Sequence, residues 1–143
     1  MSSKIKFAVV GCGHIGKRHA EMIDRNEDAE LTAIVDIKNN EELDIEKNQL
    51  PFFHFMEALI QSDLKPDVIN ISTPQGLHAS QANLCLEAGI NVVIEKPFAL
   101  STTAAAAVIL KSQQVKKNVF VVMQNRYSPP AIWLKEILES KKL

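Results

Sequence analysis

The hexapeptide GCGHIG at residues 11–16 directly follows IKFAVV at residues 5–10, a short run that is apolar and rich in β-branched residues. Glycines collect in turns for backbone reasons alone, so their spacing is weak evidence for a binding site. The flanking sequence strengthens the evidence for a binding site, because the glycines begin where a buried strand should end and a helix should start. A strand, a glycine turn and a helix in this order are typical of a fold that binds dinucleotide phosphates at the helix N-terminus.

The three glycines have separate predicted roles, and an acidic residue completes the pattern. Gly11 permits the tight turn, Gly13 lets a pyrophosphate approach the backbone, and Gly16 lets the helix pack close to the strand. The fingerprint also requires an acid at the end of the second strand, and Asp36 stands 20 residues after Gly16. We therefore predict a dinucleotide site. One alternative to a dinucleotide site is a Rossmann-like turn that binds no nucleotide. A second alternative is a methyltransferase of the same topology.

Asp36 favours NAD over NADP as the cofactor. Its carboxylate can accept hydrogen bonds from the adenosine ribose hydroxyls, and its charge repels a 2′-phosphate. Lys38 complicates this prediction, because a lysine two residues on could pair with such a phosphate. We prefer to interpret Lys38 as a solvated loop cation, so NAD is the predicted cofactor and NADP the alternative.

The rest of the chain alternates strand and helix patterns. The predicted strands are residues 5–10, 31–35, a short one within 51–55, 67–72, 91–95 and 118–123. The predicted helices are residues 15–25, 56–62, 77–88, 101–116 and 129–140, and residues 39–49 form a loop or a weak helix. The first helix is expected to turn one face to the core, made of Ile15, His19, Met22 and Ile23. Apolar strands alternating with helices predict an α/β fold with a doubly wound parallel sheet covered on both faces.

Composition excludes several classes of function. The 143 residues are 46% hydrophobic and carry a net charge of −1, so neither nucleic acid nor a membrane surface is an expected partner. No apolar run approaches the roughly 20 residues of a membrane span. The two cysteines, Cys12 and Cys85, lie far apart and form neither a disulfide framework nor a metal-ligand pattern, so no metal and a reducing cytoplasm are expected.

Two later stretches follow predicted strands and point toward the same end of the sheet: STPQGLH at residues 72–78 and EKP at residues 95–97. Together with the glycine loop, Asp36, GINVVIEKPFALS and QNRYSP, they occur in the order seen in the Gfo/Idh/MocA oxidoreductases, which the chain resembles from about residue 5 to 130. The resemblance implies an NAD(P)-binding Rossmann domain followed by a second domain with an open antiparallel sheet that holds most of the substrate.

Carried over by position, the resemblance implies a set of residues around the cofactor. They are Gly11, Gly13, His14 and Ile15 at the pyrophosphate, with Gly16 closing the glycine loop, Asp36 at the adenosine ribose, Ser72, Thr73, Pro74 and His78 along the middle and nicotinamide side, Glu95 at the nicotinamide ribose, Lys96 between nicotinamide and substrate, and Asn125 and Arg126 at the nicotinamide end. Lys96, between nicotinamide and substrate, is the implied catalytic residue, and the Lys96–Pro97 bond is often cis in the family. Gln75–Gly76 departs from the family pattern of an asparagine and a larger residue.

The implied reaction is hydride transfer between NAD(P) and a hydroxyl or ketone of a sugar, nucleotide-sugar or cyclitol. The tail MQNRYSPPAIWLKEI, residues 123–137, resembles members that oxidise nucleotide-linked sugars. None of the four histidines matches the family's acid–base histidine, which lies in the second domain. We therefore expect residues 1–124 to be the cofactor domain and residues 125–143 to begin the connection to a missing substrate domain. The apolar side of the last helix predicts a homo-oligomer. Two alternatives are a non-catalytic NAD-binding sensor and an interaction protein that has lost catalysis.

Overall fold

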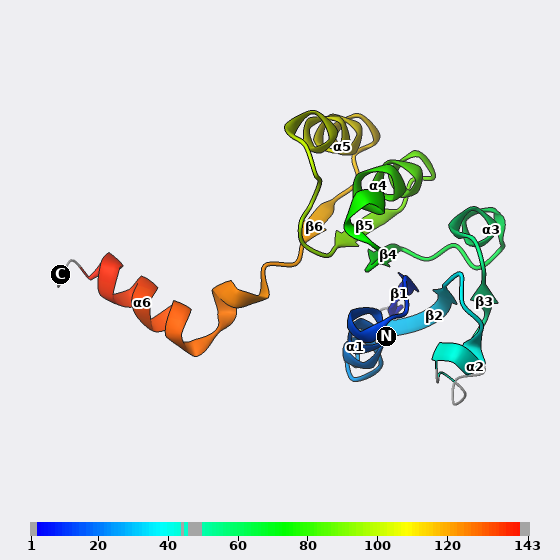
Figure 1. Cartoon of the computed structure of the whole chain (residues 1–143), viewed down its shortest axis with the longest axis horizontal. Helices are drawn as coiled ribbons and strands as arrows, with labels where there is room; N and C mark the ends of the chain where they lie inside the picture. Colours follow the sequence, from blue (N-terminus) through cyan, green and yellow to red (C-terminus); the bar gives the residue numbers. More distant parts are fainter. Residues whose placement is uncertain (1–2, 44, 46–49, 141–143) are drawn as a thin grey trace.

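Six short parallel strands form one sheet in the computed structural model, which describes residues 3–43, 45 and 50–140 (Figure 1). The strands are β1 (Ile5–Val10), β2 (Ala29–Val35), β3 (Phe52–Phe53), β4 (Val68–Ile71), β5 (Asn91–Ile94) and β6 (Val119–Val121). Their order is β3-β2-β1-β4-β5-β6, and each neighbouring pair is parallel. The chain thus starts near the middle and winds outward in both directions, which confirms the predicted doubly wound sheet.

Helices connect the strands, and one further helix follows the last strand. They are α1 (His14–Asp24), α2 (Asn40–Leu43), α3 (Met56–Gln61), α4 (His78–Glu87), α5 (Thr102–Val115) and α6 (Pro129–Glu139), with short 3₁₀ turns η1 (Gln75–Leu77) and η2 (Gln124–Tyr127). Figure 1 shows α1 on one side of the sheet and α3, α4 and α5 on the other. Each crossover between parallel strands therefore supplies a cover for one face, as expected for βαβ units.

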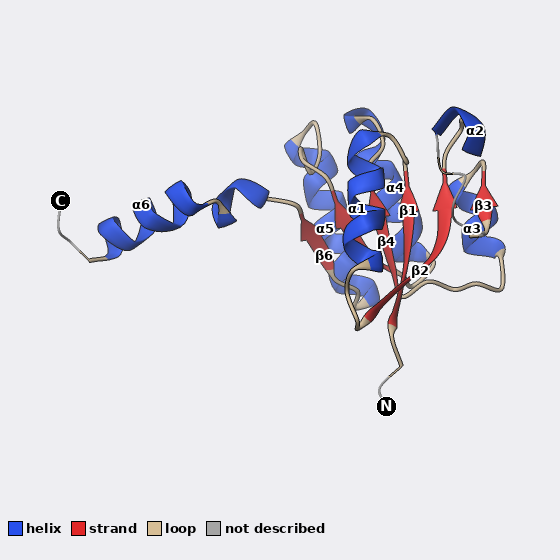
Figure 2. Ribbon diagram, turned by 90° about the horizontal axis from the view of Figure 1, so that it is seen from below, coloured by secondary structure: helices blue, strands red, loops and turns tan. Residues whose placement is uncertain are grey.

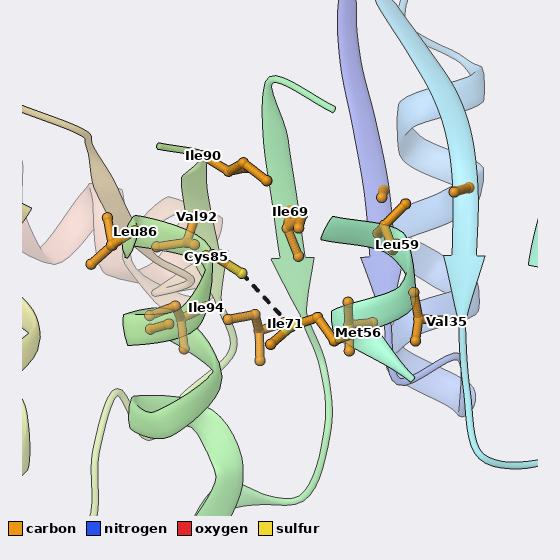
Figure 3. Close-up of a cluster of buried hydrophobic side chains, with 14 of the residues drawn as sticks. Val35, Met56, Leu59, Ile69, Ile71, Cys85, Leu86, Ile90, Val92 and Ile94 are labelled. Atoms are coloured by element: carbon orange, nitrogen blue, oxygen red, sulfur yellow. Dashed lines mark hydrogen bonds between the residues drawn. The ribbon is translucent and has the colours of Figure 1, made fainter. Parts of the chain in front are cut away.

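The larger core lies between the sheet and helices α3, α4 and α5 (Figure 3). Alternate residues of each strand face it, so Ala8 and Val10 belong to this core, whereas Val9 faces α1. Ile69, Ile71, Val92 and Ile94 form its centre. The Cys85 thiol donates to the Met56 sulfur at 3.7 Å, which joins α4 to α3. Burial of these side chains is the main source of stability that holds the strand ends in position.

The predicted apolar face of α1 is wrong for two of its four residues. Ile15 and Met22 are 42% and 46% exposed. The buried residues of α1 are Gly16, Ala20 and Ile23. Small side chains are needed because α1 lies against the glycine turn: a Cβ added to Gly16 would lie 2.0 Å from the carbonyl oxygen of Gly11. The close approach of α1 to the Gly11 backbone therefore determines which face of α1 is buried. Residue hydrophobicity does not predict such an approach.

Several predicted boundaries are confirmed. Ser101 is the N-cap of α5, where its hydroxyl accepts a hydrogen bond of 3.1 Å from the Ala104 N–H. Gly89 follows α4 with φ +75°, as the left-handed residue after a helix. The edge strand β6 is shorter than predicted, and the last hydrogen bond across it runs from the Val122 N–H to the Ile94 oxygen at 2.9 Å. Within the ambiguous segment 39–49, α2 is a short helix, and residues 44 and 46–49 lie outside the described residues.

The chain leaves the sheet after β6. Figure 2 shows η2 and α6 extending away from the helices that cover the sheet. Pro129 and Pro130 open α6, as predicted. Four of its large apolar side chains, Ile132, Trp133, Leu134 and Leu138, are exposed, and Trp133 is 63% exposed. Among the described residues, no helix is both long enough and apolar enough to cross a membrane.

Candidate cofactor-binding site

Four loops follow the carboxyl ends of β1, β2, β4 and β5 and meet at one edge of the sheet. They are residues 11–13, 36–39, 72–77 and 95–97. A cavity of about 430 Å³ lies among the first three loops. Gly11, Gly13, Asp36, Ile37, Lys38, Ser72, Thr73 and Pro74 line one part of it. An edge where parallel strands end on either side of the first strand is where open α/β sheets bind ligands.

The glycine loop contains two glycines that the fold requires and one that it does not. Gly11 has φ +84°, and a Cβ there would lie 2.7–2.8 Å from backbone atoms of Ser72 and Thr73. Gly16 has no room for a Cβ against Gly11. Gly13 differs from both, because a Cβ there would meet no atom within 4 Å. A side chain at Gly13 would instead stand in open space on the cavity surface, where a ligand could approach the backbone.

The N-terminus of α1 is free to bind an anion. Gly13 occupies the N-cap, no side chain caps the helix, and its first turn contains no acidic residue. His14 and Ile15, the first helical residues, are exposed. The early N–H groups of a helix lack intrahelical partners, and the helix dipole favours negative charge there. With the open space at Gly13, this end of α1 fits a phosphate or pyrophosphate group.

Both carboxylate oxygens of Asp36 are held by backbone N–H groups. Oδ2 accepts from the Cys12 N–H at 2.7 Å, and Oδ1 accepts from the Lys38 N–H at 2.9 Å. Each oxygen keeps a further lone pair, so the carboxylate can still accept hydroxyl donors from the cavity. Burial, and secondly the charge of Asp36, raise the pKa of the Cys12 thiol to about 11, while Lys17 acts in the opposite direction. Asp36 is thus an oriented acceptor at the end of β2.

The turn after β4 is held by α4. Thr73 Oγ1 donates to Gln81 Oε1 at 2.5 Å. His78 is 1% exposed and stands behind the turn: its Nε2 lies 2.8 Å from the Thr73 oxygen and its Nδ1 2.8 Å from the Pro97 oxygen. His78 therefore joins the 72–77 loop to the 95–97 loop. The hydroxyl of Ser72 is buried without a hydrogen-bond partner among the described residues.

The turn after β5 contains Glu95, Lys96 and Pro97, and its Lys96–Pro97 peptide bond is cis. Glu95 Oε1 lies 2.9 Å from Nε2 of His19 on α1, and Glu95 Oε2 accepts from the Lys96 N–H at 3.2 Å. The side chain of Lys96 is exposed at the same strand edge. The described residues lining the 430 Å³ cavity include none from this turn. The Glu95–Pro97 turn thus places a carboxylate and an ammonium group at the same edge of the sheet as the cavity, outside its lining.

Asn125 and Arg126 lie apart from the other predicted site residues. Both are in η2 and exposed, after the chain has left the sheet (Figure 1). Within the described part of the chain, no side-chain hydrogen bond or ion pair connects them to the loops at the strand ends. Their predicted place at the nicotinamide end stays a prediction.

Sequence reasoning missed two parts of this site. The first is the far wall of the cavity, which is formed by Phe55 and Glu57 at the start of α3, Leu77 in η1, and Gln81 and Leu84 in α4. Leu77 and Leu84 are exposed apolar residues on this wall, and their exposure would have indicated a binding surface. That exposure is known only from the structure. The second is the contact of His19 with Glu95, 76 residues apart, to which Asn70 adds a third member. No local pattern connects residues at such separations.

Comparison with known proteins agrees with this geometry. Residues 5–124 match the family model described as GFO_IDH_MocA, oxidoreductase family, NAD-binding Rossmann fold. Inositol 2-dehydrogenase of Rubrobacter xylanophilus is 32% identical over 142 residues, covering 97% of this chain and 41% of that protein. The WlbA dehydrogenase of Chromobacterium violaceum, solved with NADH and UDP-GlcNAcA, has a TM-score of 0.90 and 31% identity over 99% of this chain and 41% of that one.

A third similar structure also contains its cofactor. The scyllo-inositol dehydrogenase of Lactobacillus casei, solved with NAD(H) and scyllo-inositol, has a TM-score of 0.87 and 26% identity over 98% of this chain and 42% of its own. The chain therefore spans about two fifths of the length of the relatives that it matches.

Proposed function

We infer the function of this chain from its family, because it belongs to the Gfo/Idh/MocA oxidoreductases through the NAD-binding Rossmann fold that residues 5–124 match. We propose that it binds NAD(H) in the cavity at the strand ends and serves hydride transfer between that cofactor and a hydroxyl or ketone group. The open space at Gly13, in a loop whose other glycines are closely packed, is the observation that supports this most strongly.

The first part of the proposal concerns the adenosine diphosphate half of the cofactor. The pyrophosphate would lie against Gly13 and receive hydrogen bonds from the N–H groups of His14 and Ile15. The adenosine ribose hydroxyls would donate to Asp36, whose oxygens are already oriented by two backbone N–H groups. A 2′-phosphate in that place would meet the carboxylate charge, so NAD is the proposed cofactor in preference to NADP.

The second part concerns the nicotinamide half. Ser72, Thr73 and Pro74 would line the middle of the cofactor, and Glu95 and Lys96 would lie at the nicotinamide ribose. When bound, NAD accepts or gives the hydride, and the protein supplies position and charge. The Lys96 ammonium would face the oxygen of the reacting carbon, where a cation stabilises negative charge as the hydroxyl proton leaves. Lys96 is therefore the proposed catalytic residue.

The proposed substrates are sugars, nucleotide-sugars or cyclitols, the classes named for the similar proteins. Because the chain spans about two fifths of those relatives, turnover is proposed for a protein that also contains a substrate-binding region. Residues 1–124 would be the NAD-binding domain, and residues 125–143 would begin the connection from this domain to the substrate-binding region. The exposed apolar residues of α6 support a homo-oligomer, and the two free cysteines support a cytoplasmic protein.

Titration of NADH fluorescence tests this proposal. The 143-residue chain should bind NADH saturably and bind NADPH at least about tenfold more weakly, and Asp36→Ala should narrow that difference. No NADH should form with scyllo-inositol or UDP-GlcNAcA, because these 143 residues span only about two fifths of the relatives solved with those molecules, and positioning of the substrate supplies much of the rate. Absence of saturable NADH binding would contradict the cofactor site, and rapid turnover by this chain would contradict the need for a further region.

A further inference from the structure

A half-buried polar cluster joins three elements beneath the Glu95–Lys96 turn. His19 comes from α1, Asn70 from β4 and Glu95 from the end of β5. Nε2 of His19 lies 2.9 Å from Glu95 Oε1, and its Nδ1 lies 3.3 Å from the Asn70 amide nitrogen. The side chains of His19 and Glu95 are 19% and 13% exposed, and Asn70 is 5% exposed. Contacts in this environment are little weakened by water.

The chemistry of the groups gives these contacts a direction. An amide nitrogen only donates and an ionised carboxylate only accepts, so Asn70 donates to Nδ1 of His19 and Nε2–H of His19 donates to Glu95. The opposite amide orientation would turn Oδ1 of Asn70 toward Nδ1, and the ring would then carry both protons. Nε2 donates to Glu95 in either orientation. Donation to a charged oxygen makes this the stronger type of hydrogen bond.

The same carboxylate also holds the backbone of the catalytic candidate. While Oε1 of Glu95 is bound by His19, Oε2 accepts from the N–H of Lys96. The histidine therefore restrains a side chain that in turn restrains the turn from which Lys96 projects. Because His19 is on α1, whose N-terminus forms the proposed phosphate site, this contact joins the two ends of the proposed cofactor site.

We propose that His19 is a positioning residue: by fixing the Glu95 carboxylate, it sets the orientation of the Glu95–Lys96 turn toward the nicotinamide ribose. This inference rests on the proposed function, since it assumes that the turn faces that half of the cofactor. The competing interpretation is that His19 only packs α1 against the sheet. The two interpretations differ in which part of the ligand loses affinity when His19 is changed.

The affinities of the 143-residue chain for NADH and for ADP distinguish the positioning role of His19 from a packing role. ADP fills only the half of the site at the glycine loop and Asp36, whereas NADH also reaches Glu95. We expect His19→Leu to weaken NADH about tenfold, the usual size for loss of a charge-assisted hydrogen bond, and to change ADP affinity less than about twofold. His19→Gln should restore NADH affinity to within about threefold of the unmodified chain, since its amide can donate from nearly the same place.

Three further measurements complete the test. Glu95→Met should weaken NADH without affecting ADP, and His19→Leu should add little to it, because methionine has no oxygen to accept from His19. Lys111→Met is the matched control: it breaks the 2.9 Å contact with Glu87 between α5 and α4, and should change neither affinity. Nitrogen-15 NMR of labelled histidine should show a proton on Nε2 of His19.

The outcomes are distinguishable. Equal losses of NADH and ADP affinity in His19→Leu, or a glutamine variant no better than the leucine variant, would overturn the positioning role and leave NAD binding intact. Should the leucine variant fail to fold, an unchanged NADH affinity in Glu95→Met would overturn the positioning role equally. Failure of the unmodified chain to bind NADH would overturn the proposed function, and this inference with it.

Discussion

The glycine loop and the Glu95–Pro97 turn lie at the same edge of the sheet, but different forces hold them. The glycine loop is shaped by its own backbone: Gly11 adopts φ +84°, and Gly16 packs against the Gly11 oxygen. The Glu95–Pro97 turn is held by side chains from distant helices, His19 on α1 and His78 on α4. The backbone of the glycine loop depends first on its own glycines, with tertiary contacts to Asp36 and to the Ser72–Thr73 backbone, whereas the second turn depends on side chains from two helices. Substitutions should therefore affect the two regions differently.

The largest expected effect separates binding from folding within the glycine loop. Gly13→Val should weaken NADH binding at least about 100-fold, because its side chain would occupy the space left for the pyrophosphate. Its free energy of unfolding should stay within about 1 kcal/mol, since no atom lies within 4 Å of the added Cβ. Titration of NADH fluorescence and urea unfolding measure the two quantities.

Gly16→Ala is the reciprocal control. Its Cβ would lie 2.0 Å from the Gly11 oxygen, so we expect it to lower the free energy of unfolding by about 3 kcal/mol or more. If Gly13→Val were as destabilising as Gly16→Ala, the distinction between a ligand-facing and a packed glycine would be wrong.

An intermediate effect is expected in the second turn. His78→Leu should lower the free energy of unfolding by about 2 kcal/mol, because the Thr73 or the Pro97 carbonyl oxygen would lose the buried N–H that donates to it. His54→Leu provides the control, since His54 is exposed, and should change stability by less than about 0.5 kcal/mol. Thermal and urea unfolding measure both. Equal stabilities of the two variants would show that His78 does not hold the turn.

The smallest effect expected of a substitution is a several-fold change in the reactivity of Cys12, within the glycine loop. Its pKa of about 11 leaves the thiol protonated at pH 8, so alkylation by iodoacetamide should be roughly 100-fold slower than for an exposed thiol with a pKa near 9. The rate should rise with pH up to about 11, because the thiolate is the reactive form. Asp36→Asn should increase the rate several-fold at pH 8 by removing one cause of the raised pKa, while burial remains.

Mass spectrometry of the modified peptide measures the rate for Cys12 separately from that for Cys85, whose pKa burial raises to about 12. Rapid alkylation of Cys12 at pH 8 in the folded chain would contradict the burial of the loop.

Local patterns were enough to predict most of the fold. The six strands, the order of the helices, the cap at Ser101 and the left-handed Gly89 all follow from apolar runs and residue-specific backbone preferences, which act over a few residues. The same reasoning failed for the buried face of α1. Ile15 and Met22 are more apolar than Gly16, yet Gly16 faces the sheet, because a Cβ at this position would lie 2.0 Å from the Gly11 oxygen.

The sequence by itself determined a parallel α/β sheet with a glycine loop and Asp36 at its strand ends, because each depends on a short pattern with a fixed spacing. Only the tertiary structure decided that His78 stands behind the loops between two carbonyl oxygens, and that His19 binds Glu95. The His78–Pro97 and His19–Glu95 contacts join residues 19 and 76 positions apart in the sequence, through crossovers that bring separate strand ends together. Hydrogen-bond partners at such distances are selected by the packing of whole elements, which no local spacing encodes.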